Sequence, residues 1–252
     1  MTDLFSLSGR VALVTGASGG LGRHFGRVLH AAGASVALAA RRPESVAAEA
    51  AALGERAMAV ALDVTDAASI AAALDAVEAR FGSCDLLVNN AGIAATKPFL
   101  DHADDDWDRV MDVDLRGAFV MAQAAAKRMV AAGREGAIVN IASILGMRVI
   151  PGVASYSAAK AGLIQLTRQM AVELARHRIR VNALAPGYVA TDINRDFFAS
   201  EAGQALLKRI PQRRLGTVDD LTGPLLLLAS RAGAHMTGSV VTVDGGHSVN
   251  SL

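Results

Sequence analysis

Short runs of apolar residues recur along the chain, and within each run nearly every position is apolar. A continuous run of this kind is typical of a strand in a parallel sheet whose two faces are both covered. The pattern predicts about seven such strands, at residues 11–14, 35–38, 57–60, 86–88, 137–141, 180–183 and 240–243.

Alanine-rich stretches lie between these runs and predict helices at 20–32, 44–53, 66–81, 104–132, 153–177 and 217–230. Thr65-Asp66 and Thr217 stand at helix starts, where their side chains suit N-terminal caps. Four helices are followed by a glycine, which suits a left-handed C-terminal cap: Gly33, Gly54, Gly82 and Gly133. Alternating strands and helices predict an α/β fold, a doubly wound parallel sheet with helices on both faces. We find no repeat or linker, which favours one domain over residues 1–252.

Composition narrows the class of protein. The chain has 52% hydrophobic and 19% charged residues, which suits a globular protein with a large core. Its 25 basic and 24 acidic residues give no support to nucleic-acid binding. No run approaches the roughly 20 apolar residues of a membrane span, and the first residues lack the basic region of a signal peptide. The single Cys84 lies in an apolar run and predicts a buried structural thiol. We therefore expect a soluble, cytoplasmic protein, without a metal site.

Glycines cluster directly after the first predicted strand and before the first predicted helix. The segment is Thr15-Gly16-Ala17-Ser18-Gly19-Gly20-Leu21-Gly22. Glycines let the backbone approach a pyrophosphate, and the following helix start offers free N–H groups. The spacing Gly-x3-Gly-x-Gly differs from the commonest dinucleotide fingerprint, and a tight turn without a ligand remains the alternative. The position in the chain favours a phosphate site formed by Gly16, Ser18, Gly20, Leu21 and Gly22.

Two arginines follow the second predicted strand, at Arg41 and Arg42. A carboxylate at this point would bind the ribose hydroxyls and repel a 2′-phosphate. Guanidinium groups suit a phosphate by charge and by geometry. The sequence therefore predicts a preference for NADP(H), with NAD(H) possible; two solvated arginines at the start of a surface helix are the alternative interpretation.

Ser143, Tyr156 and Lys160 form the candidate catalytic set. Ser143 follows the fifth predicted strand, and Tyr156 and Lys160 stand at i and i+4 of a predicted helix, so they share one face. Reduction of a carbonyl leaves an alkoxide that a tyrosine can protonate if a nearby cation favours its phenolate. A serine hydroxyl can orient the carbonyl. Each residue alone has a structural explanation; the combination with a dinucleotide turn favours catalysis.

At this point the sequence resembles the short-chain dehydrogenase/reductase family over essentially its whole length, in a branch of NADP-preferring carbonyl and 3-oxoacyl reductases. The resemblance includes the glycine turn and the catalytic set. It continues in the motifs Asp63-Val64, Asn89-Asn90-Ala91-Gly92, 182–191, Thr237-Gly238-Ser239 and Asp244-Gly245-Gly246. It implies a Rossmann-type fold and an oxidoreductase that transfers a hydride between a nicotinamide cofactor and a carbonyl or secondary alcohol.

The resemblance also implies roles for single residues. Tyr156 would be the acid/base, Lys160 would bind the nicotinamide ribose and Ser143 would orient the substrate. Asp63 would contact the adenine, and Val64 would also belong to the cofactor site. Asn90, Ala91 and Gly92 would lie beside the adenosine ribose, and the nicotinamide end would be held by Pro186, Gly187, Val189 and Thr191. Family members are often tetramers whose interface uses the two long helices, so we expect a homotetramer.

Two positions depart from the family pattern. Asp114 stands where the family usually has an Asn that supports a water-linked proton relay to the lysine, and we count Asp114 with the catalytic residues. An ionised side chain loses the amide donor, so our hypothesis is a relay with altered pH dependence. Gly19 stands where many NADP-preferring relatives have a basic residue, which leaves the cofactor prediction to Arg41 and Arg42.

Two mostly apolar segments should flank the nicotinamide and form the substrate pocket: Ile144, Leu145, Met147 and Ile150 in the first, and Tyr188, Ile193, Phe197 and Phe198 in the second. A lid near 191–212 is expected. Arg148 or Arg195 could meet an anionic group, although solvated arginines are the simpler interpretation.

An apolar ketone is therefore the first expectation for the substrate. A 3-oxoacyl thioester comes second, and a sugar or polyol comes third because the loops are apolar. From a different class, a non-catalytic dinucleotide sensor is disfavoured by the intact catalytic set, and only Asp114 leaves room for it.

Overall fold

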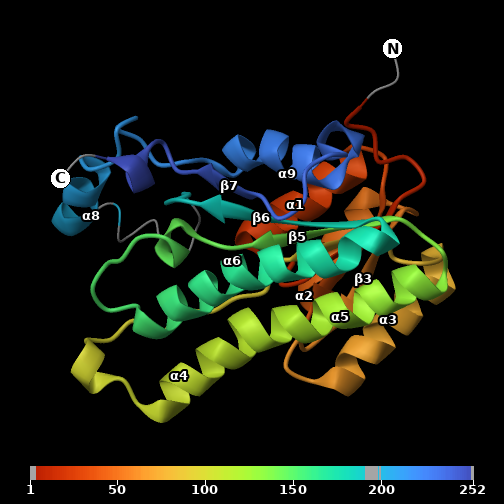
Figure 1. The fold of residues 1–252 in the computed structure, drawn as a ribbon, viewed down its shortest axis with the longest axis horizontal. Helices are drawn as coiled ribbons and strands as arrows, with labels where there is room; N and C mark the ends of the chain where they lie inside the picture. Colours follow the sequence, from red (N-terminus) through yellow and green to blue (C-terminus); the bar gives the residue numbers. More distant parts are fainter. Residues whose placement is uncertain (1–3, 191–197, 199, 251–252) are drawn as a thin grey trace.

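Seven parallel strands form one sheet in the computed structural model, which describes residues 4–190, 198 and 200–250 (Figure 1). The strands are β1 (Val11–Val14), β2 (Ser35–Ala40), β3 (Ala57–Ala61), β4 (Leu86–Asn89), β5 (Gly136–Ile141), β6 (Ile179–Pro186) and β7 (Val240–Val243). Their order is β3-β2-β1-β4-β5-β6-β7, so the chain winds outward in one direction from β1 and then in the other from β4. The predicted single-domain, Rossmann-type doubly wound sheet is confirmed, and its switch point lies between β1 and β4, where such folds bind ligands.

The helices also follow the sequence pattern closely. Those predicted are α1 (Gly20–Ala31), α2 (Glu44–Leu53), α3 (Ala67–Phe81), α4 (Asp104–Met111), α5 (Ala118–Ala131), α6 (Ala154–Leu174) and α9 (Thr222–Ala229). A π-helical turn, η2 (Asp112–Gly117), joins α4 to α5, so the long stretch predicted at 104–132 is one nearly continuous rod. Two short 3-10 turns, η4 (Ala175–His177) and η5 (Val218–Leu221), fall inside the helical stretches predicted at 153–177 and 217–230. The sequence pattern missed α8 (Glu201–Leu207) and the other 3-10 turns, which are η1 (Phe99–Asp101), η3 (Ile144–Gly146), η6 (Arg231–Gly233) and η7 (His247–Val249).

Helices cover both faces of the sheet, as continuous apolar strands require (Figure 1). On one face, buried side chains of α1, α2 and α9 pack on the strands, with Phe25 and Leu225 fully buried. On the other face, α3, α5 and α6 contribute a second core that includes Ile70 and Met121. Cys84 lies in this second core with no exposed surface, which confirms the predicted structural thiol.

Helix ends use the predicted caps. The Asp66 side chain accepts the N–H of Ala68 at the start of α3, and the Thr217 N–H donates to the Asp220 carboxylate at the start of η5. All four predicted cap glycines have positive φ, for example 107° at Gly33. Among the described residues, no helix combines the length and the hydropathy needed to cross a bilayer.

A buried polar network fixes α6 against the centre of the sheet. Asn89 Nδ2 donates to Asn140 Oδ1 at 3.0 Å, which joins β4 to β5. Asn140 Nδ2 donates to Thr167 Oγ1 at 2.8 Å, and this hydroxyl donates to Leu163 O at 2.8 Å. Because satisfied buried polar groups require specific partners, the network sets the position of α6 on the sheet.

Candidate active site

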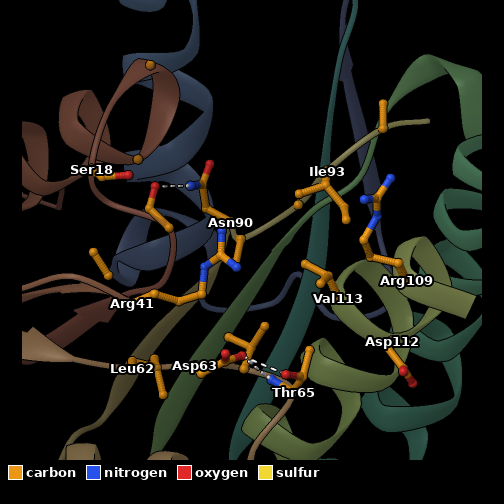
Figure 2. A pocket seen from close by; sticks show the side chains of 18 of the residues that line it. Ser18, Arg41, Leu62, Asp63, Thr65, Asn90, Ile93, Arg109, Asp112 and Val113 are labelled. Carbon is orange, nitrogen blue, oxygen red and sulfur yellow. Dashed lines mark hydrogen bonds between the residues drawn. The ribbon is translucent and has the colours of Figure 1, made fainter. Parts of the chain in front are cut away.

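A cavity of about 1360 Å³ opens at the carboxyl ends of β1 to β4 (Figure 2). It exceeds the roughly 300–1000 Å³ of common small-molecule pockets, as an extended ligand requires. We call it the dinucleotide cleft. Its walls contain the predicted residues Gly16, Ser18, Gly20, Leu21, Gly22, Arg41, Asp63, Val64, Asn90, Ala91 and Gly92.

The glycine turn is held by Asn90 and closed to larger side chains. Asn90 Nδ2 donates to Thr15 O at 2.9 Å and to Gly16 O at 3.1 Å. A Cβ on Gly22 would lie 2.3 Å from Gly16 O, and one on Gly16 would lie 2.8 Å from Ala91 Cα. The start of α1 has no side-chain cap, so its N–H groups remain available to an anion. These features fit the pyrophosphate of a dinucleotide.

Arg41, Asp63 and Thr65 line one side of the dinucleotide cleft, and Arg109 from α4 lies across from them (Figure 2). Asp63 Oδ1 accepts the N–H of Thr65 at 2.9 Å and its hydroxyl at 2.7 Å. These two hydrogen bonds lower the pKa of Asp63, with a smaller contribution from Arg41. Both Arg41 and Arg42 are exposed, but only Arg41 lines the cleft, so the structure separates the two arginines that the sequence paired.

A second cavity, of about 440 Å³, adjoins the first and contains Ser143, Tyr156 and Lys160 together. We call it the catalytic cavity. Ser143 Oγ accepts the N–H of Leu145 at 3.1 Å, which leaves its own O–H free to donate to another group. Predicted nicotinamide-side residues in this wall are Pro186, Gly187 and Val189.

Lys160 contacts three groups around this cavity. Its Nζ donates to Ile141 O at 3.0 Å, lies 3.1 Å from Asp114 Oδ2 and stands 5.4 Å from the centre of the Tyr156 ring. Asp114 Oδ1 accepts the N–H of Ile93 at 2.7 Å. Burial raises the pKa of Asp114, and the nearby Lys160 and the Ile93 hydrogen bond oppose this effect.

The predicted substrate residues are distributed differently. Tyr188 lines the catalytic cavity, but the first apolar segment and Phe198 do not. Ile144 is buried, Met147 and Ile150 lie toward the surface, and Phe198 packs edge-on against Tyr188 with ring centres 5.7 Å apart. Four named residues lie outside the described part of the chain, as does the first part of the predicted lid: Thr191, Ile193, Arg195 and Phe197.

His247 is a residue that sequence reasoning missed. Its ring lies 5.5 Å from the Tyr188 ring. Burial lowers the pKa of His247; Asp244 opposes this effect, and Arg148 and Arg209 strengthen it. Nothing in the local sequence signals this contact, because it joins η7 to the segment after β6.

This sheet, its glycine turn and the paired Tyr and Lys define a dinucleotide-dependent oxidoreductase. Residues 16–248 match the family described as Enoyl-(Acyl carrier protein) reductase. Together with the relatives below, this match shows that the chain belongs to the short-chain dehydrogenase/reductase family, as the sequence predicts. It is therefore an NAD(P)-dependent oxidoreductase acting on CH–OH and C=O groups.

The similarity to these relatives extends over nearly the full length of the chain. The 2-dehydro-3-deoxy-D-gluconate 5-dehydrogenase of Escherichia coli (strain K12) is 42% identical over 96% of both chains. Gluconate 5-dehydrogenase of Gluconobacter oxydans (strain 621H) is 40% identical over 98% of both chains. A solved gluconate 5-dehydrogenase from Burkholderia cenocepacia J2315, in complex with NADP and tartrate, has a TM-score of 0.94 and 40% identity over 99% of both chains.

Proposed function

We propose that the protein interconverts a secondary alcohol and a ketone on a small hydroxylated substrate, of the polyol or sugar-acid class, with NADP(H) as cofactor. The observation that supports the reaction is the meeting of Ser143, Tyr156 and Lys160 in one cavity beside the dinucleotide cleft. This proposal moves the sugar or polyol class ahead of the apolar ketone that the sequence favoured.

The three side chains divide the proton chemistry. When bound, NADP(H) supplies or accepts the hydride. Tyr156 Oη gives a proton to the substrate oxygen in reduction and takes it back in oxidation. The Lys160 ammonium favours the phenolate by charge and would also hold the nicotinamide ribose. The Ser143 hydroxyl, free to donate, orients the substrate oxygen.

The cofactor preference is assigned to Arg41. Its guanidinium lines the dinucleotide cleft, and the relative from B. cenocepacia binds NADP. Arg41→Ala should lower the ratio of kcat/KM with NADPH to kcat/KM with NADH by about 10-fold or more, because a charge-assisted contact contributes about 1.5–3 kcal/mol. Arg42→Ala is the matched control, since Arg42 lies outside the cleft. Equal ratios in the wild type and in Arg41→Ala would contradict the assignment.

Unpartnered polar atoms favour a hydroxylated substrate. Tyr188 Oη and His247 Nδ1 are buried and have no hydrogen-bond partner among the residues that the structure describes. Buried polar groups are nearly always paired, so a hydroxylated substrate in the catalytic cavity would satisfy Tyr188, which lines it. Arg148 and Arg209 add positive charge on this side, which suits a carboxylate. Two of the relatives named above are gluconate 5-dehydrogenases, and one of these holds tartrate.

The test is a substrate panel followed through the absorbance of NADPH. It comprises a polyol, D-gluconate, an apolar secondary alcohol with its ketone, and a 3-oxoacyl thioester. We expect the highest kcat/KM with the polyol or the sugar acid, and no turnover in Tyr156→Phe. A higher kcat/KM for the apolar pair would restore the first expectation from the sequence. Turnover retained in Tyr156→Phe would remove that residue from its role.

We also infer a homotetramer. Phe119 on α5 and Val172 on α6 are 42% and 78% exposed, on the two helices whose counterparts the family resemblance places at an interface. Exposed apolar side chains on such helices suit burial between copies of the chain. Light scattering coupled to gel filtration should give four times the chain mass, and a monomer mass would contradict the inference.

A further inference from the structure

Asp114 places a fully buried carboxylate directly behind the catalytic cavity. The π-helical turn η2 carries it between α4 and α5, and such turns are frequent at functional sites. Oδ2 lies 3.1 Å from Lys160 Nζ, with side-chain exposures of 0% and 5%. A Cβ on Gly92 would lie 2.8 Å from Oδ2 and 3.3 Å from Nζ. The absence of a side chain at Gly92 therefore leaves space for this ion pair.

The ammonium of Lys160 is surrounded by a carbonyl, the Asp114 carboxylate and two tyrosines. The ammonium has three donor positions, of which one is used by Ile141 O at 3.0 Å. Asp114 faces it from η2 and Tyr156 from the preceding turn of α6. Tyr188, from the segment after β6, is the next titratable group on the cavity side, and burial together with Tyr156 raises its pKa. Lys160 is the charged side chain that acts on Asp114.

Two charges of opposite sign at this distance cancel much of each other's field. An amide at the same position could occupy the same space and still accept from Ile93, but it would leave the ammonium uncompensated. We propose that Asp114 is a positioning residue that acts through Lys160, compensating its positive charge and so raising the pH at which Tyr156 releases its proton. This inference rests on the proposed acid/base role of Tyr156.

Removing the charge of Asp114 should shift the pH dependence of alcohol oxidation in one direction. A phenolate is favoured by an uncompensated neighbouring cation. In Asp114→Asn the full charge of Lys160 acts on Tyr156, so the proton leaves at lower pH. Alcohol oxidation requires the phenolate, and the acid limb of its pH profile should therefore move to lower pH by about one unit.

The experiment measures kcat and kcat/KM for alcohol oxidation from about pH 5 to about pH 10. It compares the wild type with Asp114→Asn and with Asp114→Ser, a second neutral variant. Both should shift the acid limb downward, because both remove the charge. An unmoved limb, or a shift to higher pH, would overturn the inference. Asp75→Asn is the matched control, since Asp75 also pairs with a cation, Arg128, but on the surface of α3.

Absorbance titration tests the same point without turnover. The chain has only two tyrosines, so a Tyr188→Phe background isolates the ionisation of Tyr156. Adding Asp114→Asn to this background should lower the midpoint by the same amount as the kinetic limb. An unchanged midpoint would reject the inference even if the variant is inactive.

The Tyr156→Phe variant distinguishes a failure of the inference about Asp114 from a failure of the proposed function. If it loses activity while Asp114→Asn leaves the pH profile unmoved, the inference fails and the proposed function stands. If Tyr156→Phe remains active, the proposed function itself fails.

Discussion

Gly146 lies where η3 meets the backbone of α6, and we predict that Gly146→Ala impairs both folding and catalysis. A Cβ at this position would lie 2.8 Å from the carbonyl carbon and oxygen of Lys160 and 2.9 Å from the nitrogen of Ala161. Carbon atoms in contact prefer about 3.5 Å or more, so η3 and α6 must separate by about 0.7 Å. The neighbours are backbone atoms, which no rotamer change can move. Overpacking of this kind costs about 1–3 kcal/mol.

The same displacement reaches the proposed catalytic groups. η3 begins directly after Ser143, and α6 carries Tyr156 and Lys160. Pushing the two elements apart moves the serine hydroxyl relative to the phenol. A misplacement of about 1 Å can cost about 100-fold, so we expect kcat/KM to fall between about 10- and 100-fold.

Two measurements check this prediction. Thermal unfolding should show a loss in Tm of about 2–4 °C for each kcal/mol, and initial rates of alcohol oxidation should show the loss in kcat/KM. Gly223→Ala in α9 is the matched control, because an added Cβ there meets no atom within 4 Å. We expect no loss of stability or activity in the control. Wild-type Tm and kcat/KM in Gly146→Ala would refute the argument from packing.

Three further predictions concern buried groups. Thr167→Val removes the hydroxyl that accepts from Asn140 Nδ2, so denaturant unfolding should show a loss of about 1–3 kcal/mol; no loss would mean that the network does not stabilise α6. Burial raises the pKa of Cys84 to about 12, so iodoacetamide at neutral pH should label the protein only after denaturation, and rapid labelling of the native protein would contradict its burial. Burial raises the folded-state pKa of Asp114 above its ordinary 3.8, so the native state binds the proton more tightly than the unfolded state does. The stability of the wild type relative to Asp114→Asn should therefore fall as the pH rises from about 3.8 through the folded-state pKa, and urea unfolding that shows a constant difference would reject this.

Local pattern was enough to predict the sheet and most of its helices. A continuous apolar run predicts each strand because both faces of the sheet are covered. All seven predicted runs are strands in the structure. The pairing of Tyr156 with Lys160 was also predictable, since residues at i and i+4 share one helix face. Shorter elements such as α8 were missed, because a helix of seven residues offers too little periodicity.

Amino-acid order alone was therefore enough to predict the doubly wound fold, the candidate phosphate turn and the candidate catalytic set, since each depends on residues close together in the chain or at strand ends that a parallel sheet brings to one edge. Contacts between distant segments needed the folded chain. Only the folded chain separates Arg41 from Arg42, brings Asp114 against Lys160 and sets His247 beside Tyr188. Such contacts depend on how helices and loops pack side chain by side chain, and neither residue of a distant pair carries a local signal of its partner.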